Sequence, residues 1–275
     1  MTRLSRSQHV TEAAKEMPHH LVPGSLPDEV SEAVAELGLG RAIAYARGGG
    51  RPKRRQLTLY AFDDGAVFTD RRDRVIAAPY WDDVRSLLFD VHVLIKPQLD
   101  IGSVLHQFVR FLTFDIDDSA APSLELRDAP DRTLASDYAT YGMREDLRHE
   151  FGPLVSAVRD KVAAAQMPRL GQEITEGAEA RFGPFTVSRD GLRGNAELIP
   201  WSAKPLIFYG YQWNDTPPMG NRGLVTVRCG PVDGGPFSHG PELMRAWSAQ
   251  VPNLRTLERL CDGMQSDPPF IPSER

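Results

Sequence analysis

The sequence has little cysteine, no long apolar run and no strong excess of one charge. Two cysteines in 275 residues, Cys229 and Cys261, cannot build a disulfide framework and are typical of a reducing compartment. No apolar run approaches the roughly 20 residues that span a bilayer. The first residues, Met1–Arg6, have no apolar segment behind them that would make a signal peptide. We therefore expect a cytoplasmic protein without a transmembrane segment.

Charge and composition further limit the kinds of protein that this chain could be. The net charge of −5 argues against a general nucleic-acid binder, whose surface is usually basic. Hydrophobic residues at 41% and charged residues at 25% are ordinary for a soluble globular protein. The length of 275 residues suffices for one large or two small domains, each with its own core.

The motifs of common active sites are missing. There is no Gly-x-Ser-x-Gly elbow for a hydrolase nucleophile, and the Gly48–Gly50 run lacks the Lys-Ser/Thr that binds phosphates and magnesium. Asp115, Asp117 and Asp118 end a strand-like segment without the spacing of a calcium loop. Histidines 92, 106, 149 and 239 are scattered. These observations favour a non-catalytic protein without metal or cofactor; an enzyme with an unrecognised site is the alternative.

The most distinctive feature is a repeat. Phe182–Leu192 followed by Leu198–Trp201 predicts a strand, an Asp-Gly turn, a second strand and a tryptophan in the core. Leu57–Val67 followed by Ala78–Trp81 predicts the same series. In each turn we expect the glycine to supply a positive φ angle.

Periodicity predicts the remaining elements. The clearest helix covers residues 143–166, with Pro153 in its first turn and Pro168 and Gly171 ending it, and residues 169–181 form a linker or short entry strand. A short helix over residues 28–38 has Asp28 as its cap and Gly38 at its end. Further helices are expected over residues 241–248 and 252–263. Strands are expected at 41–47, 57–62, 66–69, 75–78, 86–95, 109–116, 123–127, 206–213 and 224–229.

The most basic segment runs from Arg47 to Arg55, between the first two expected strands. Its glycines and proline predict a loop, and its cations create a local positive field. It is either a solvated hairpin tip or a site for phosphate or an anionic lipid head group. The candidate ligands of that site are Arg51, Lys53, Arg54 and Arg55.

Several of these motifs together resemble the actinobacterial DUF6585-like family of uncharacterised proteins. The resemblance rests on Arg181–Leu192, Ile199–Trp201, Val251–Leu254, Leu39–Arg41 and Tyr80–Val84. It extends over residues 37–262 and implies tandem bacterial pleckstrin-homology-like (PH-like) domains. Many relatives have a membrane hairpin where this chain has its basic loop, so membrane anchorage is not carried over. The family supplies no catalytic residues.

These observations predict an α+β fold of two PH-like domains, each a bent antiparallel sheet capped by a C-terminal helix. Residues 1–27 and 266–275 are flexible tails, and the domains cover residues 28–168 and 169–265. A single mixed sandwich that shares both sheets is the competing fold. The expected function is a regulatory or interaction module with an unknown protein partner. The alternative is a peripheral binder of an anionic membrane surface or phosphorylated ligand through residues 47–55.

Overall fold

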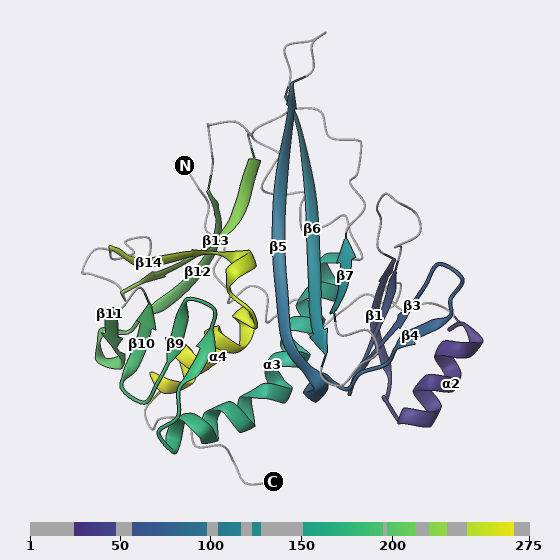
Figure 1. The fold of residues 1–275 in the computed structure, drawn as a ribbon, viewed down its shortest axis with the longest axis horizontal. Coiled ribbons are helices and arrows are strands. Elements are labelled where there is room, and N and C mark those ends of the chain that lie inside the picture. Colours follow the sequence, from purple (N-terminus) through teal and green to yellow (C-terminus); the bar gives the residue numbers. More distant parts are fainter. Residues whose placement is uncertain are drawn as a thin grey trace.

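The computed structural model describes residues 25–47, 57–97, 104–116, 123–127, 151–194, 197–212, 220–229 and 241–266. Within these residues the fold is α+β: three antiparallel sheets carry three α-helices (Figure 1). The predicted N-terminal tail up to residue 24, the segment 128–150 with the start of the long helix, and the tail after residue 266 lie outside the described residues.

The chain passes twice through the same order of elements. The first half contains α2 (Asp28–Leu37), β1 (Ala42–Arg47), β2 (Thr58–Phe62), β3 (Ala66–Thr69), β4 (Val75–Ala77), the 3₁₀ turn η3 (Trp81–Asp83), β5 (Val84–Pro97), β6 (Val104–Ile116) and β7 (Ser123–Arg127). It ends in α3 (Phe151–Thr175), which leads into the second half.

The second half repeats this order after α3. It contains β8 (Ala180–Phe182), β9 (Phe185–Val187), β10 (Gly191–Gly194), β11 (Glu197–Pro200), η4 (Trp201–Ala203), β12 (Leu206–Gln212), β13 (Gly220–Arg228), β14 (Glu242–Trp247), η5 (Ser248–Gln250) and α4 (Leu254–Met264). Each half thus has four strands, a 3₁₀ turn that begins at a tryptophan, three strands and a helix. The predicted repeat of strand, turn, strand and tryptophan is confirmed.

The strands form two small sheets and one shared sheet. Strands β1 to β4 pair in sequence order, and β8 to β11 do the same. The shared sheet has the order β12-β13-β5-β6-β7, with β14 also paired to β13. The halves meet where Gly220–Arg222 of β13 pairs with His92–Leu94 of β5.

Three apolar clusters hold these layers together. The first cluster lies between β1–β3, β5–β7 and α3, and the second lies between β8–β14, α4 and the end of α3. A third cluster packs α2 on the opposite face of β1–β4, around Val30, Tyr60 and Phe62. The β1–β4 sheet is therefore buried on both faces, which explains the unbroken burial of β2 and β3. The β8–β11 sheet has no such outer cover among the described residues, and in β8 and β9 buried residues alternate with more exposed ones.

The long helix does not end where the sequence predicted. It continues through Pro168 to Thr175, so residues 169–175 are helix rather than linker. Pro168 and Ala164 are both exposed, so the backbone carbonyl that loses its partner faces water. Packing fixes both ends, because Leu154 and Val158 belong to the first cluster and Ile174 to the second. Figure 1 shows α3 passing from the strands of the first half to those of the second.

Residues 242–247 form strand β14, so the helix predicted over 241–248 is wrong. Met244 and Ala246 face the second cluster, whereas Arg245 and Trp247 point away. That alternation is the period of a strand, and pairing with β13 decides it. The predicted final helix is confirmed as α4. The other predicted strands are found, those at 66–69 and 123–127 with the predicted bounds and the rest with shifted ends.

Two local predictions were also wrong. Residue Pro27 precedes α2, and Asp28 is the helix's first residue and gives no side-chain cap, although Gly38 ends the helix in the left-handed conformation as predicted. The turn glycines Gly65 and Gly191 are not among the glycines with positive φ. They are required for close approach: a Cβ on Gly65 would lie 2.5 Å from the Pro79 carbonyl oxygen, and one on Gly191 2.2 Å from that of Ile199.

Candidate functional site

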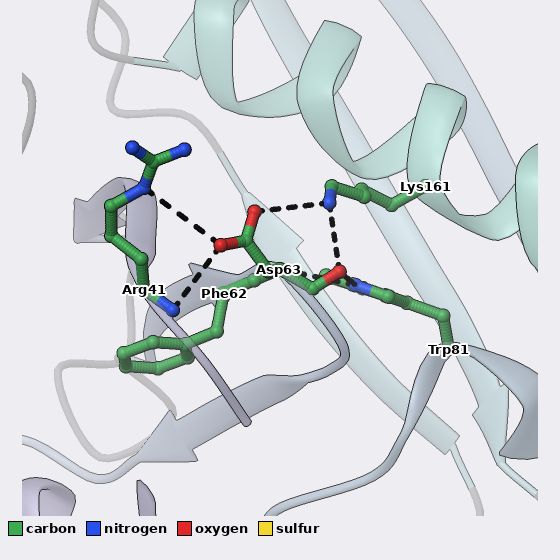
Figure 2. A network of polar contacts seen from close by, with 5 residues as sticks. All are labelled: Arg41, Phe62, Asp63, Trp81 and Lys161. Atoms are coloured by element: carbon green, nitrogen blue, oxygen red, sulfur yellow. Dashed lines mark hydrogen bonds and ion pairs between the residues drawn. The ribbon is translucent and has the colours of Figure 1, made fainter. Parts of the chain in front are cut away.

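One polar site surrounds Asp63, in the turn between β2 and β3 (Figure 2). Lys161 of α3 donates from Nζ to the Asp63 carbonyl oxygen at 2.8 Å and to its carboxylate Oδ1 at 3.2 Å. The backbone N–H of Arg41 donates to Oδ2 at 3.3 Å, and its guanidinium lies 3.8 Å away. Burial opposes ionisation, but the Lys161 and Arg41 contacts outweigh it and hold the pKa of Asp63 below its usual value. The site ties a turn to a helix.

The two repeated tryptophans donate hydrogen bonds to equivalent turns. Trp81 donates from Nε1 to the carbonyl oxygens of Phe62 and Asp63 at 3.1 and 3.2 Å. Trp201 donates from Nε1 to the carbonyl oxygens of Ser188 and Arg189, both at 3.1 Å. Trp81 is only 3% exposed, whereas Trp201 is half-buried. The prediction that Trp201 fills the core is therefore correct only in part.

In a second repeated contact, a glutamine in or just after each helix donates a hydrogen bond to a backbone carbonyl at the start of a strand. Gln166 of α3 donates to the carbonyl oxygen of Val84 at 2.9 Å, and its own oxygen accepts from the Thr256 hydroxyl at 2.9 Å. Gln265, just after α4, donates to the carbonyl oxygen of Pro205 at 2.8 Å. Gln166 is buried, and through Thr256 it also links α3 to α4.

Charged side chains join α3 to α4. The Asp160 carboxylate accepts hydrogen bonds from Arg255 and Arg259, each at 2.8 Å. Arg255 also donates to Glu258 at 3.1 Å, and Arg159 lies 3.9 Å from the same carboxylate. Burial alone would lower the pKa of Arg255, but its pairs with Asp160 and Glu258 raise it. All five side chains are at least partly buried, so this cluster is a joint between the halves.

Asn253 makes a further joint at the edge of β5. Its backbone N–H donates to the Leu87 carbonyl at 2.8 Å, and its side-chain oxygen accepts from the Leu87 N–H at 2.8 Å. Its side-chain amide donates to the Arg85 carbonyl at 3.0 Å. Asn253 adopts the left-handed conformation, which asparagine tolerates better than most residues. It therefore mimics a short strand added to β5.

The two cysteines are free thiols in different environments. Cys229 is partly exposed, whereas Cys261 is buried in the second apolar cluster. Burial raises the pKa of the Cys261 thiol far above its usual value. Because the thiolate is the nucleophilic form, Cys261 is a packing residue.

The predicted anion-binding residues Arg51, Lys53, Arg54 and Arg55 lie outside the described residues. The strands that flank them are placed, with Arg47 paired to Thr58 and Thr58 paired to Thr69. The turn between β3 and β4, residues 70–74, therefore leaves the same end of the sheet. It carries three exposed arginines, Arg71, Arg72 and Arg74.

The other predicted candidates are described only in part, and His149 and His239 lie outside the described residues. Asp115 accepts a hydrogen bond from the Ser86 hydroxyl at 2.8 Å, while Asp117 and Asp118 lie outside the described residues. His92 and His106 lie on β5 and β6, opposite Val109 and Ile95. In the described ranges no group of three His, Cys, Asp or Glu side chains could hold a metal ion. No helix there is long and apolar enough to span a bilayer.

The sequence reasoning missed Asp63, Lys161, Gln166 and Asn253. Lys161 and Gln166 interrupt the otherwise apolar stripe of α3, which was a usable signal for polar groups facing a neighbour. Their partners could not be read from spacing, because Lys161 and Asp63 are 98 residues apart. No protein-family model matches the chain, and no curated protein matches it.

Proposed function

We propose that this chain is a non-catalytic, cytoplasmic protein of two PH-like units that binds another protein. The observation that carries the proposal is the repeated order of four strands, a tryptophan turn, three strands and a covering helix. Scaffolds of this kind bind through loops and sheet edges, while their cores only position those parts. The units share α3, so their boundary falls within that helix rather than in a linker.

The polar contacts of the described residues support a scaffolding role. The side chains of Asp63, Gln166 and Asn253 each bond to backbone groups distant in the sequence. The free thiols of Cys229 and Cys261 agree with a reducing compartment. The resemblance to the DUF6585-like family is part of the same proposal, because the interpretation as tandem PH-like domains comes from it.

Affinity purification of the tagged full chain from native lysate, followed by size-exclusion chromatography, tests this function. The expected result is one protein that co-elutes in near-stoichiometric amount and is absent with an unrelated tagged protein. Recovery of no stoichiometric partner would count against an interaction module. Turnover of a substrate by the pure chain would favour the alternative, an enzyme with an unrecognised site.

A second candidate function is binding of an anionic lipid head group or phosphorylated ligand. The specific support is the strand register: β1 ends and β2 begins at the same end of the β1–β4 sheet as the β3–β4 turn. Arg74 of that turn is paired with Asp70 at 2.8 Å, whereas Arg71 and Arg72 are exposed. Cations from two loops would then act on one ligand.

Flotation with phosphatidylserine vesicles at low and physiological salt tests this candidate. Changing Arg51, Lys53, Arg54 and Arg55 to alanine should abolish flotation. The matched control changes four cations of the second half to alanine: Arg181, Arg189, Arg193 and Lys204. Equal loss in both variants would indicate a net-charge effect, and unchanged binding in the loop variant would exclude the loop. Competition by inorganic phosphate separates a head-group site from a general surface attraction.

A further inference from the structure

Helix α2 covers the outer face of the β1–β4 sheet and lies at one end of the molecule (Figure 1). The sheet residues Phe62, Val67 and Val75 pack with it, and we call these three residues the α2-docking face. The helix contributes one apolar stripe with the spacing i, i+3, i+4 and i+7. Its members are Val30, Ala33, Val34 and Leu37. This is the pattern with which an amphipathic helix binds an apolar surface of another chain.

The equivalent face of the second half is polar and has no such helix among the described residues. Its cross-strand neighbours on β8 to β11 are Arg181, Thr186, Arg193 and Leu198. Both arginines are exposed, and Leu198 is the apolar exception. The same order of four strands therefore pairs into a sheet without an outer helix. Helix α2 is an addition to the repeated unit rather than a part of it.

The attachment of α2 to the rest of the chain is short. Of its ten residues only Val30 is fully buried, and no side chain caps its N-terminus. Helices of fewer than about 12 residues are marginal in water, so α2 depends on the α2-docking face. Gly38 ends the helix with a φ of 64° in open space. The next residue is held independently, because the Leu39 carbonyl accepts from the Asp64 N–H at 3.1 Å. Rotation about Gly38 can therefore release α2 and leave β1 in place.

Two hydrogen bonds position the ends of α2 on the sheet. Glu29 accepts from the Val75 N–H at 3.0 Å through Oε2, and the Leu37 carbonyl accepts from the Tyr80 hydroxyl at 2.7 Å. Strand β4 is an edge strand, so the N–H of Val75 is open to a carboxylate from a helix. Glu29 directly precedes the first apolar residue of the stripe, Val30. The α2-docking face thus fixes the direction and register of the helix that it binds.

We propose that a helix of a partner protein displaces α2 and occupies the α2-docking face. Because α2 shows which chemistry this face binds, the partner helix has apolar residues at i, i+3, i+4 and i+7 and a carboxylate at i−1. This partner is the protein partner of the proposed function, so the assignment rests on that function. Until the partner binds, α2 keeps Phe62 and Val67 out of water. Tethering gives α2 an effective concentration on the order of millimolar, which a partner helix must overcome.

Fluorescence anisotropy with a labelled synthetic peptide of residues 25–38 tests the proposal on the full chain. In the chain, Val30→Asp places a charge at a fully buried position and detaches the chain's own α2. The wild-type peptide should bind this variant at least about tenfold more tightly than it binds the wild-type chain, in which α2 competes. The matched control is Glu32→Ala in the chain, an exposed α2 residue whose change should leave peptide binding at the wild-type level. A peptide with Val30→Asp should bind neither chain.

Circular dichroism establishes that the Val30→Asp chain is folded, and hydrogen exchange of the wild type adds a measurement that needs no variant. The amides of α2 should exchange at least about tenfold faster than those of β2 and β3, because the helix opens without the sheet. Equal exchange overturns the proposal, as does a folded Val30→Asp chain that binds the peptide no more tightly than the wild type. Protection of α2 that rises with protein concentration would assign the face to a second copy's helix and overturns a foreign partner.

Failure of this surface and failure of the proposed function give different results. The peptide reports on the α2-docking face alone, whereas affinity purification reports on any partner. A recovered partner without peptide exchange keeps the proposed function and removes this surface. Peptide exchange without a recovered partner supports the docking face and counts against an interaction module.

Discussion

The two halves share an order of elements but differ in how tightly their turns are held. In the first half, Trp81 is buried and the turn it binds is also held by Lys161 of α3. In the second half, Trp201 makes the equivalent two hydrogen bonds but is only partly buried. Helix α2 covers the outer face of the first small sheet, whereas the second has no such cover among the described residues.

The difference shows that the repeat preserves backbone contacts and varies what surrounds them. The indole-to-turn bonds and the glutamine-to-strand bonds occur in both halves, because each satisfies backbone carbonyls that the turn or strand start leaves unpaired. Burial around those bonds differs. The same hydrogen bond should therefore contribute more to the free energy of unfolding in the first half, where its loss leaves a buried carbonyl without a partner.

Alanine at the two tryptophans should give the largest difference. Trp81→Ala should cost about 3–5 kcal/mol of unfolding free energy, because it empties a buried site and frees two carbonyls. Trp201→Ala should cost about 1–2 kcal/mol, because that side chain is only partly buried. Urea unfolding followed by far-ultraviolet circular dichroism measures both. Phenylalanine at each position separates the lost hydrogen bonds from the lost volume. Equal costs at the two sites would refute the proposed difference between the halves.

Replacing the two equivalent glutamines by leucine should give a smaller difference in stability cost between the halves. Gln166→Leu should cost about 1–3 kcal/mol, since it leaves the Val84 carbonyl and the buried Thr256 hydroxyl without their partners. Gln265→Leu should cost about 0.5–1 kcal/mol, since it breaks a single bond at a helix end. The double change Gln166→Leu with Thr256→Val should recover part of the loss. A Gln265 variant as unstable as the Gln166 variant would contradict the ranking.

The sequence was a good guide to strands and a poor guide to long-range contacts. The short apolar runs at Thr58–Phe62 and Leu206–Gln212 are local signals, so most strands were predicted within a few residues. The continuation of α3 past Pro168 was missed because packing on two clusters outweighs the local cost of a proline. Strand β14 was mistaken for a helix because only its pairing with β13 decides it. The partners of Lys161, Gln166 and Asn253 lie 82 to 168 residues away, and no spacing rule reaches that far.

Removing Asp160 should weaken the joint between the halves. Asp160→Ala leaves Arg255 and Arg259 partly buried without their shared carboxylate, and should cost about 1–2 kcal/mol. Hydrogen exchange should then accelerate in both α4 and the middle of α3. The control is Arg169→Ala, which breaks an exposed pair with Glu173 and should change stability by at most about 0.5 kcal/mol. Faster exchange confined to α4 would show that the halves are not coupled through this joint.

Removing the Lys161–Asp63 pair should have the smallest effect on stability. Its dependence on pH distinguishes the charge contact from packing. Both side chains are about one-third exposed, so Lys161→Met should cost only about 0.2–1 kcal/mol at pH 7. The folded-state pKa of Asp63 is lowered, so the pair stabilises the fold above the unfolded pKa near 3.9 and loses that effect as pH falls further. The difference between wild type and variant should therefore shrink between pH 5 and pH 3. Arg189→Met in the equivalent turn of the second half should show no such change, because that turn has an arginine where the first has Asp63. If the stability cost of Lys161→Met does not change with pH, Lys161 stabilises the fold by packing its aliphatic stem against the turn. The charge contact with Asp63 would then not contribute to the difference between the halves.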